Sequence, residues 1–304
     1  MTAVPVPAHP AALARLLGPG RDTGSLDLVL NLTAIILLLR PFDVWWVSPF
    51  VLLGAGLCLL FPAVRGHAVT WWVLAGLIAL RIVEVWPLSD NHIYLLAYWC
   101  LAVGLALHAV DADALLARAS RWLLGAAFAF AVLWKAFLSP DYLDGRFFRV
   151  TLLTDPRFGD AVQVVGGMPK DTLDHNREAL VALPGGASLL TPTPIVEPPR
   201  FRAFALALTW GGVLLEGLLA LLHLGPWSRR LDLLRHLALL LFCVTTYAFA
   251  PVAGFGWLLA TMGLAQCARD QHVLRGSYVA VFFLVLLYSE IPWAGVIASW
   301  MSTT

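Results

Sequence analysis

The chain has 304 residues, of which 60% are hydrophobic and 13% are charged, with a mean hydropathy of +0.80 and a net charge of +1. So apolar a composition excludes an ordinary soluble domain. The small net charge, without any basic stripe, excludes nucleic-acid binding. We therefore predict an all-α, polytopic membrane helical bundle whose first partner is the lipid bilayer.

The N-terminal 24 residues and the cysteines exclude further classes of segment and site. Residues 1–24 contain four prolines but no apolar core of signal-peptide length, so a cleaved signal is not expected. The short stretch Ala11–Leu17 is predicted to lie on the membrane surface. The four cysteines stand singly in apolar segments, which is typical of buried hydrophobes and predicts neither disulfides nor a metal site.

Nine apolar segments are candidates for transmembrane helices, which need about 20 residues to cross about 30 Å of hydrocarbon. They are Ser25–Leu39, Val44–Val64, His67–Trp86, His92–Val110, Trp122–Leu138, Phe201–Leu224, Leu231–Ala250, Pro251–Cys267 and Gly276–Trp300. The first is short and contains Asp27 and Asn31, so its alternative is an interfacial or half-inserted helix. The prediction is eight or nine spans, five within residues 25–138 and the rest within 201–304.

The arginines predict the orientation of the bundle. If the N-terminus is cytoplasmic, ten arginines fall in inner segments: Arg15, Arg21, Arg65, Arg118, Arg121, Arg229, Arg230, Arg235, Arg269 and Arg275. The short outer connections contain only Arg40. This asymmetry follows the positive-inside rule and places residues 139–200 and the C-terminus outside the cytoplasm.

The long segment Ser139–Arg200 is predicted to be a functional lid or a small subdomain, because loops of this length are seldom mere connectors. Its alternative is a flexible insertion. Its first part is apolar enough to pack against the membrane domain, through Tyr142, Leu143, Phe147, Phe148, Val150, Leu152 and Leu153.

Lys135 is the most informative residue, because it is the only charge within the apolar run Trp122–Leu138 of a chain with two lysines and eighteen arginines. An ammonium group inside a membrane helix costs at least a few kcal/mol, so it normally has a partner or a function. The alternative is that Lys135 lies near the helix end and extends its charge to the interface. A desolvated lysine can act as a base, whereas a lysine paired with a carboxylate stays charged.

The predicted topology brings polar and ionisable groups of four spans to the same outer depth. They are Arg81, Glu84, Asp90, Asn91, His92, Lys135 and Glu290. We predict that the Lys135 ammonium lies within about 8 Å of a polar atom of His92, Glu84, Glu290 or Asp144, close enough for one bridging water. Arg81 and Glu84 can instead pair on one helix face, and Asp90 and Asn91 can serve only as helix caps.

Glu216 is also isolated in an apolar span. By helix rise it lies about 20 Å from the predicted outer end of that span. Direct contact between Glu216 and Lys135 is therefore not expected.

Two short motifs resemble a known membrane family. Asn91-His92-Ile93-Tyr94-Leu95 is similar to an Asn-His-x-Tyr-Leu motif at the start of a membrane helix. Leu133-Trp134-Lys135, followed by Ser139-Pro140-Asp141-Tyr142-Leu143-Asp144-Gly145, is similar to a helix-ending lysine and its turn. The pair Trp210 and Glu216 is similar to a helix with an aromatic residue before a glutamate. These features resemble the HTTM (horizontally transferred transmembrane) proteins and the vitamin K-dependent gamma-carboxylase.

The resemblance implies an enzyme with Lys135 as the base that deprotonates vitamin K hydroquinone and His92 as the assisting residue. Glu290 or Glu84 would tune the charge, with Arg81, Asn91, Asp144 and Glu216 as supporting residues. The chain lacks the large lumenal domain of the carboxylase, so peptide gamma-carboxylation is not expected. A quinone-like molecule from the lipid phase, or a partner protein, is the expected substrate. The alternative is a non-catalytic membrane protein that binds a partner, assists export or maturation, or transports a solute.

Overall fold

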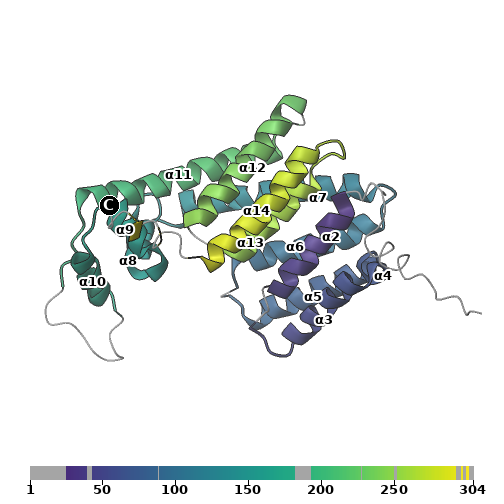
Figure 1. The fold of residues 1–304 in the computed structure, drawn as a ribbon, viewed down its shortest axis with the longest axis horizontal. Helices are drawn as coiled ribbons and strands as arrows, with labels where there is room; N and C mark the ends of the chain where they lie inside the picture. Colours follow the sequence, from purple (N-terminus) through teal and green to yellow (C-terminus); the bar gives the residue numbers. More distant parts are fainter. Residues whose placement is uncertain are drawn as a thin grey trace, which may run out of the picture.

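The computed structural model describes residues 25–39, 43–87, 89–181, 193–226, 228–249, 252–291, 296 and 299–300. Within these ranges every regular element is a helix, which confirms the all-α prediction (Figure 1). The helices are α2 (Ser25–Leu39), α3 (Ser48–Leu60), α4 (Pro62–Arg65), α5 (Ala68–Glu84), α6 (Asn91–Leu107), α7 (Ala112–Leu133), η1 (Trp134–Leu138), α8 (Arg146–Thr154), η2 (Pro156–Phe158), α9 (Gly159–Val164), α10 (Lys170–Ala179), α11 (Pro199–Leu224), α12 (Arg229–Phe249), α13 (Ala253–Ala265) and α14 (His272–Glu290).

The helix lengths differ from the predicted spans. Within the described ranges, two helices are long and apolar enough to cross a membrane, Ala112–Leu138 with 27 residues and Pro199–Leu224 with 26. Five other apolar helices have only 10–17 residues: Ser25–Leu39, Ser48–Leu60, Asn91–Leu107, Gly254–Ala265 and His272–Tyr288. The lengths of the described helices therefore do not support eight or nine full-length spans.

Two local features explain where the predicted boundaries were wrong. The predicted span Val44–Val64 is divided at Phe61, which is extended (φ −123°, ψ 103°) because it precedes Pro62. Helix α7 begins at Ala112, nearly three turns before the predicted start at Trp122. Asp111 caps it by accepting a hydrogen bond from the Ala114 backbone N–H at 3.0 Å.

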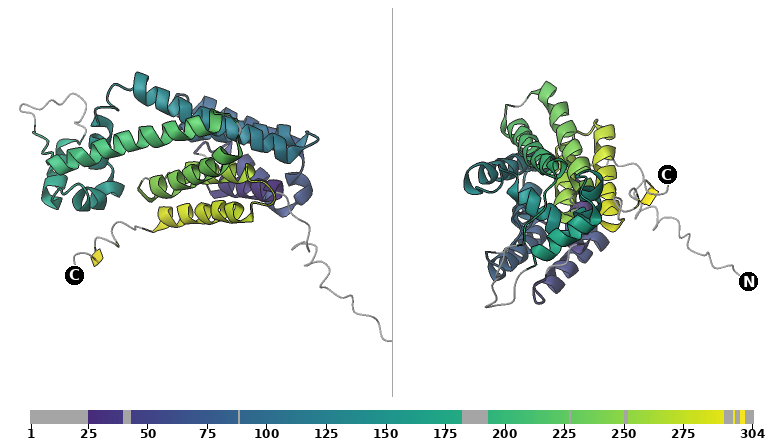
Figure 2. Two further views of the ribbon diagram at one scale, coloured as in Figure 1. Left: turned by 90° about the horizontal axis from the view of Figure 1, so that it is seen from above. Right: turned by 90° about the vertical axis from the view of Figure 1, so that its left-hand side faces the viewer.

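Helix α13 forms the centre of the bundle and packs against α2, α7, α12 and α14. Its residues are apolar around the whole circumference, which is typical of a helix enclosed by others. Trp257, Leu259 and Met262 are among its fully buried members. The two long helices, α7 and α11, pack along one another at the side of this core (Figure 2).

The segments with the predicted inner arginines meet at one end of the bundle. Arg65 donates to the Asp27 carboxylate at the start of α2 at 2.7 Å. Asp113, at the start of α7, accepts from the Leu26 N–H at 3.2 Å and pairs with Arg269 at 3.0 Å. Of the other predicted inner arginines, Arg15 and Arg21 lie outside the described residues, as do the side chains of Arg229 and Arg230.

Arg121 joins the two long helices at this same end. Its Nε donates to the His223 carbonyl at 2.7 Å, and its Nη2 donates to the Gly225 carbonyl. These carbonyls lie at the end of α11, where a helix has unpaired acceptors and a partial negative charge. Arg121 is therefore a buried connection between α7 and α11 as well as part of the arginine asymmetry.

The described part of Ser139–Arg200 folds as a small helical subdomain at the opposite end (Figure 1). It has its own apolar core, made of Leu152, Leu153, Phe158, Val162, Met168 and Leu173, with Phe201 and Ala205 of α11. Asn176 is fully buried, and its side-chain amide bonds both the N–H and the carbonyl of Val196 at 2.9 and 2.8 Å. The N-terminal half of α11 is thus part of the subdomain.

Candidate functional site

Lys135 forms an ion pair with Glu216. The ammonium nitrogen lies 2.5 Å from Oε1 and 2.6 Å from Oε2 of the carboxylate, so both oxygens accept. The side chains are only 20% and 13% exposed. A charge-assisted contact of this kind is stronger than a neutral hydrogen bond. The prediction that Glu216 lies too deep to touch Lys135 is wrong.

The length of α11 explains this correction. The prediction measured the depth of Glu216 from Phe201, taken as the outer end of the span. Phe201 and Ala205 instead lie in the core of the subdomain, so α11 projects beyond the end of α7 (Figures 1 and 2). Glu216 is consequently level with the end of α7, where Lys135 lies.

Lys135 is held in a turn of unusual geometry. Residues Trp134–Leu138 form a π-helical turn, closed by a hydrogen bond from the Ser139 N–H to the Trp134 carbonyl at 2.9 Å. A π-turn inserts one residue into a helix and recurs at functional sites. Here it ends a long apolar helix at Lys135.

Tyr142 completes the site and was missed by sequence reasoning as a site residue. The Lys135 ammonium lies 5.0 Å from the centroid of its ring, within the range of a cation–π contact. The ring is 5% exposed and packs against Phe147 and Phe148 at 5.3 and 5.8 Å between centroids. The available signal was an aromatic residue seven positions after the lysine, in the turn similar to the family motif.

The Tyr142 hydroxyl is directed toward α11. It lies 3.5 Å from the position that a Cβ atom would take on Gly212, one turn before Glu216. Burial and, secondly, the Glu216 carboxylate raise the pKa of Tyr142 above its ordinary value. The phenol therefore remains a neutral hydrogen-bond donor beside the ion pair at physiological pH.

The turn between Lys135 and α8 depends on Gly145 and Asp144. Gly145 has a left-handed backbone (φ 81°) and lies against Leu206 and Thr209 of α11. Asp144 accepts from the backbone N–H of Arg146 at 2.9 Å and from its Nε at 2.5 Å. The first of these bonds is the main cause that lowers the pKa of Asp144. Asp144 is thus engaged with Arg146, and it stabilises the turn.

The other predicted outer residues lie near the junction of α5 and α6. Arg81 is buried, donates to the Ser89 hydroxyl at 3.0 Å, and lies 3.7 Å from the Asp43 carboxylate. Glu84 is exposed at the end of α5. The sequence reasoning considered an Arg81–Glu84 pair and did not foresee Ser89 or Asp43 as partners.

His92 and Asn91 start α6, as predicted. Asn91 is exposed, whereas His92 is half-buried with its ring centroid 6.4 Å from that of Phe255 in α13. Asp90 holds the N-cap position, but its side chain makes no capping hydrogen bond. His92 is therefore placed between α6 and the central helix.

The contacts of Lys135 within the described residues are with Glu216 and Tyr142. Its predicted approach to His92, Glu84 or Asp144 within about 8 Å stays a prediction. The side chain of Glu290 lies outside the described residues, although α14 ends at that position.

The geometry defines what this site can do chemically. An ammonium and a carboxylate at 2.5 Å can exchange a proton, and transfer to Glu216 would leave a neutral amine on Lys135. Among the described residues, no group of three or more His, Cys, Asp or Glu side chains is placed to hold a metal ion. Comparisons with protein-family models, with curated proteins and with solved structures give no match for this chain.

Proposed function

We propose that this chain is a polytopic integral membrane protein of the HTTM and gamma-carboxylase type, with Lys135 and Glu216 as its acid–base centre. The helix surfaces support membrane insertion. The most apolar windows of the two long helices are only 22% and 28% buried inside the protein, unlike the core helices of soluble proteins. Large apolar side chains are exposed along both: Phe130, Leu133, Leu206, Leu214, Leu218 and Leu221. A soluble protein rarely exposes so large an apolar surface.

The shorter helices extend this proposal to the rest of the bundle. Helices of 13–17 residues are about 20–26 Å long, a little less than the hydrocarbon thickness of about 30 Å. Local thinning of the bilayer and flanking aromatic residues accommodate such a difference. Exposed tryptophans support this at the ends of several helices: Trp45, Trp86 and Trp134. In this proposal the eight or nine predicted segments form the membrane domain.

The Lys135–Glu216 contact is the observation that carries the proposed chemistry. A neutral Lys135, formed by proton transfer to Glu216, would accept a proton from a weakly acidic substrate, as the resemblance implies for vitamin K hydroquinone. The surroundings support a substrate from the lipid phase. The apolar neighbours Trp134, Phe137 and Leu214 are 61%, 78% and 69% exposed, so the site borders an apolar surface.

The same contact favours a second function class. A lysine held by both oxygens of a carboxylate is also the expected geometry of a structural ion pair, which would fix α7 to α11. Lys135 would then stabilise a non-catalytic protein that binds a partner, assists its export or maturation, or transports a solute. Substitutions at the two positions separate these functions.

The test uses Lys135→Arg, which keeps the charge but cannot act as a base near neutral pH. We would measure consumption of vitamin K hydroquinone by the full chain in nanodiscs, together with thermal unfolding. If Lys135 is the base, Lys135→Arg folds with near-normal stability but consumes no hydroquinone above background. Full activity of Lys135→Arg would exclude the general-base role, and an inactive wild type would favour the structural function.

A matched pair of variants controls for stability. Lys135→Met leaves the Glu216 carboxylate without its partner and should lower stability by about 1–3 kcal/mol, less than for a fully buried pair. Adding Glu216→Gln removes that uncompensated charge and should recover most of the loss. Loss of activity in the recovered double variant then reports chemistry rather than unfolding.

A further inference from the structure

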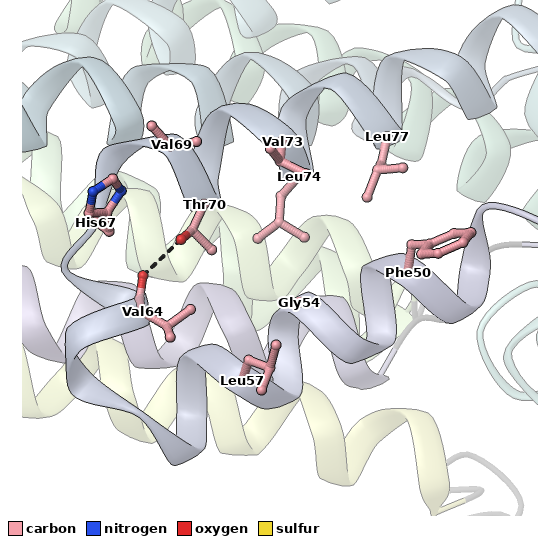
Figure 3. A pocket seen from close by; sticks show the side chains of 10 residues that line it. All are labelled: Phe50, Gly54, Leu57, Val64, His67, Val69, Thr70, Val73, Leu74 and Leu77. Carbon is pink, nitrogen blue, oxygen red and sulfur yellow. Dashed lines mark hydrogen bonds between the residues drawn. The ribbon is translucent and has the colours of Figure 1, made fainter.

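A narrow groove runs along the outside of the bundle between α3 and α5 (Figure 3). Phe50, Gly54 and Leu57 of α3 form one wall, and Val73 and Leu77 of α5 contribute to the other. His67 lies at one end, in the connection that precedes α5. The groove has a volume of about 320 Å³. It lies away from the Lys135–Glu216 site, and neither element contributes to that site.

Gly54 explains why a groove forms here. A Cβ atom on Gly54 would come 3.0 Å from the Cδ2 methyl of Leu74, so α3 and α5 approach closely at this point. Phe50 and Leu57, on either side of Gly54 along α3, stand beyond the contact and form the walls. Phe50 and Val73 are 60% and 56% exposed, so the groove is open along its length to the surroundings of the bundle.

The groove is polar at only one end. Its one ionisable side chain is His67, close to the end where Arg65 pairs with Asp27. The Thr70 hydroxyl donates to the Val64 carbonyl at 2.9 Å and is therefore satisfied (Figure 3). The remaining lining side chains are apolar. An occupant must accordingly have one polar end and an apolar body.

The length of the groove matches that of a lipid chain in one leaflet. Leu77 lies ten residues after His67, a rise of about 15 Å along α5. That distance is half of the hydrocarbon thickness of about 30 Å, or one leaflet.

We propose that the groove binds one acyl chain of a phospholipid from the leaflet at the His67 end, with the headgroup beside His67 and the chain end between Phe50 and Leu77. The proposal rests on the membrane embedding proposed above and is independent of any activity of Lys135. A bound lipid of this kind would fill the space between α3 and α5 beside the close approach of Gly54 and Leu74.

The test is photolabelling of the full chain in phosphatidylcholine vesicles that contain a small fraction of diazirine-labelled phosphatidylcholine. One probe carries the diazirine near the carboxyl end of its chain, and the other carries it at the chain terminus. Labelled residues are identified by mass spectrometry. We expect the first probe to label His67 and Thr70 and the second to label Phe50 and Leu77, both above the labelling of Leu214, an exposed apolar residue of α11.

Variants make the test specific for the groove. Gly54→Leu fills the groove and should reduce its labelling to the level of Leu214. The matched control is Gly76→Leu in α5. Gly76 is exposed and does not line the groove, and a Cβ atom added there would meet no neighbouring side chain within 4 Å. Its groove labelling should equal that of the wild type. If Gly54→Leu fails to fold, Val73→Trp narrows the groove from its exposed side.

Several results would overturn the proposal. Groove labelling no stronger than that of Leu214 would show that lipid contacts the groove only as it contacts any apolar face. Unchanged labelling in both groove variants would also overturn the acyl-chain site. Crosslinks between two protein chains across the groove would overturn it as well. Labelling of Leu214 without groove labelling would overturn the acyl-chain site alone. No labelling of either would contradict membrane embedding, and the groove proposal with it.

Discussion

At the scale of single residues, the site combines an ion pair with a turn that only certain residues can form. Lys135 and Glu216 neutralise each other at the border of an apolar surface, where an unpaired charge would be costly. Tyr142 covers the ammonium with its ring, and Gly145 lets the chain return from α7 to α8. The position of the pair therefore depends on the backbone of the turn as well as on its two charges.

Gly145→Ala should lower the stability of the protein. A side chain at φ 81° costs about 1–2 kcal/mol, and its Cβ would also come 3.1 Å from Leu206. The matched control is Gly276→Ala in α14, where an added Cβ would meet no neighbouring side chain within 4 Å and a helical alanine stabilises by up to about 1 kcal/mol. Thermal unfolding in detergent should therefore give shifts of opposite sign. A neutral Gly145→Ala would contradict the role of this turn.

At the scale of elements, helix α11 takes part in three regions of the structure. Its N-terminal half completes the core of the subdomain, its middle carries Glu216, and its end is held by Arg121. The small helices α8, α9 and α10 depend on local interactions to supplement this shared core. Asp155 makes one of these interactions: its side chain caps the turn η2 by accepting a hydrogen bond from the Arg157 backbone N–H at 3.0 Å.

The subdomain should lose stability in acid partly through Asp155. The side-chain hydrogen bond from Arg157, followed by the backbone bond, lowers the pKa of Asp155 below its unfolded value of about 3.9. A lowered carboxyl pKa stabilises the folded state above the unfolded value, and this contribution is lost as pH falls through the folded-state pKa. Asp155→Asn should thus weaken α8–α10 at pH 7 but not in acid, where both states are protonated.

Hydrogen exchange of the backbone amides in α8–α10 measures this effect. Asp160→Asn is the control, because the Asp160 side chain makes no hydrogen bond or ion pair within the part of the chain that the structure describes. It should change protection less at pH 7. A difference between wild type and Asp155→Asn that persists unchanged at acid pH would contradict the linkage.

At the scale of the whole molecule, the arrangement of charge separates two ends. One end gathers Arg65, Arg121 and Arg269 with their partners, and the other carries the helical subdomain and the Lys135–Glu216 pair. If the protein is inserted as proposed, the arginine-rich end faces the cytoplasm. The subdomain then lies outside, where it covers the site on that side of the bilayer.

Single-cysteine labelling in intact cells tests this orientation. The native cysteines Cys58, Cys100, Cys243 and Cys267 are buried, so introduced cysteines should dominate the signal. An impermeant maleimide should label Asp171→Cys in the subdomain and leave Ser228→Cys, between α11 and α12, unlabelled. Both should react after permeabilisation. Labelling of Ser228→Cys alone in intact cells would reverse the proposed orientation.

The sequence by itself determined the all-helical class, the place of most helices and the isolation of the Lys135 charge in an apolar helix, because apolar composition and an isolated charge are local properties. The tertiary structure decided which residue pairs with Lys135. That choice depends on how far α11 projects past the end of α7, and no count of residues along a single helix contains this offset. It also brought the Tyr142 ring to the ammonium, through the turn that follows Lys135. It gave the buried Arg121 a structural role, since that contact joins segments far apart in the chain.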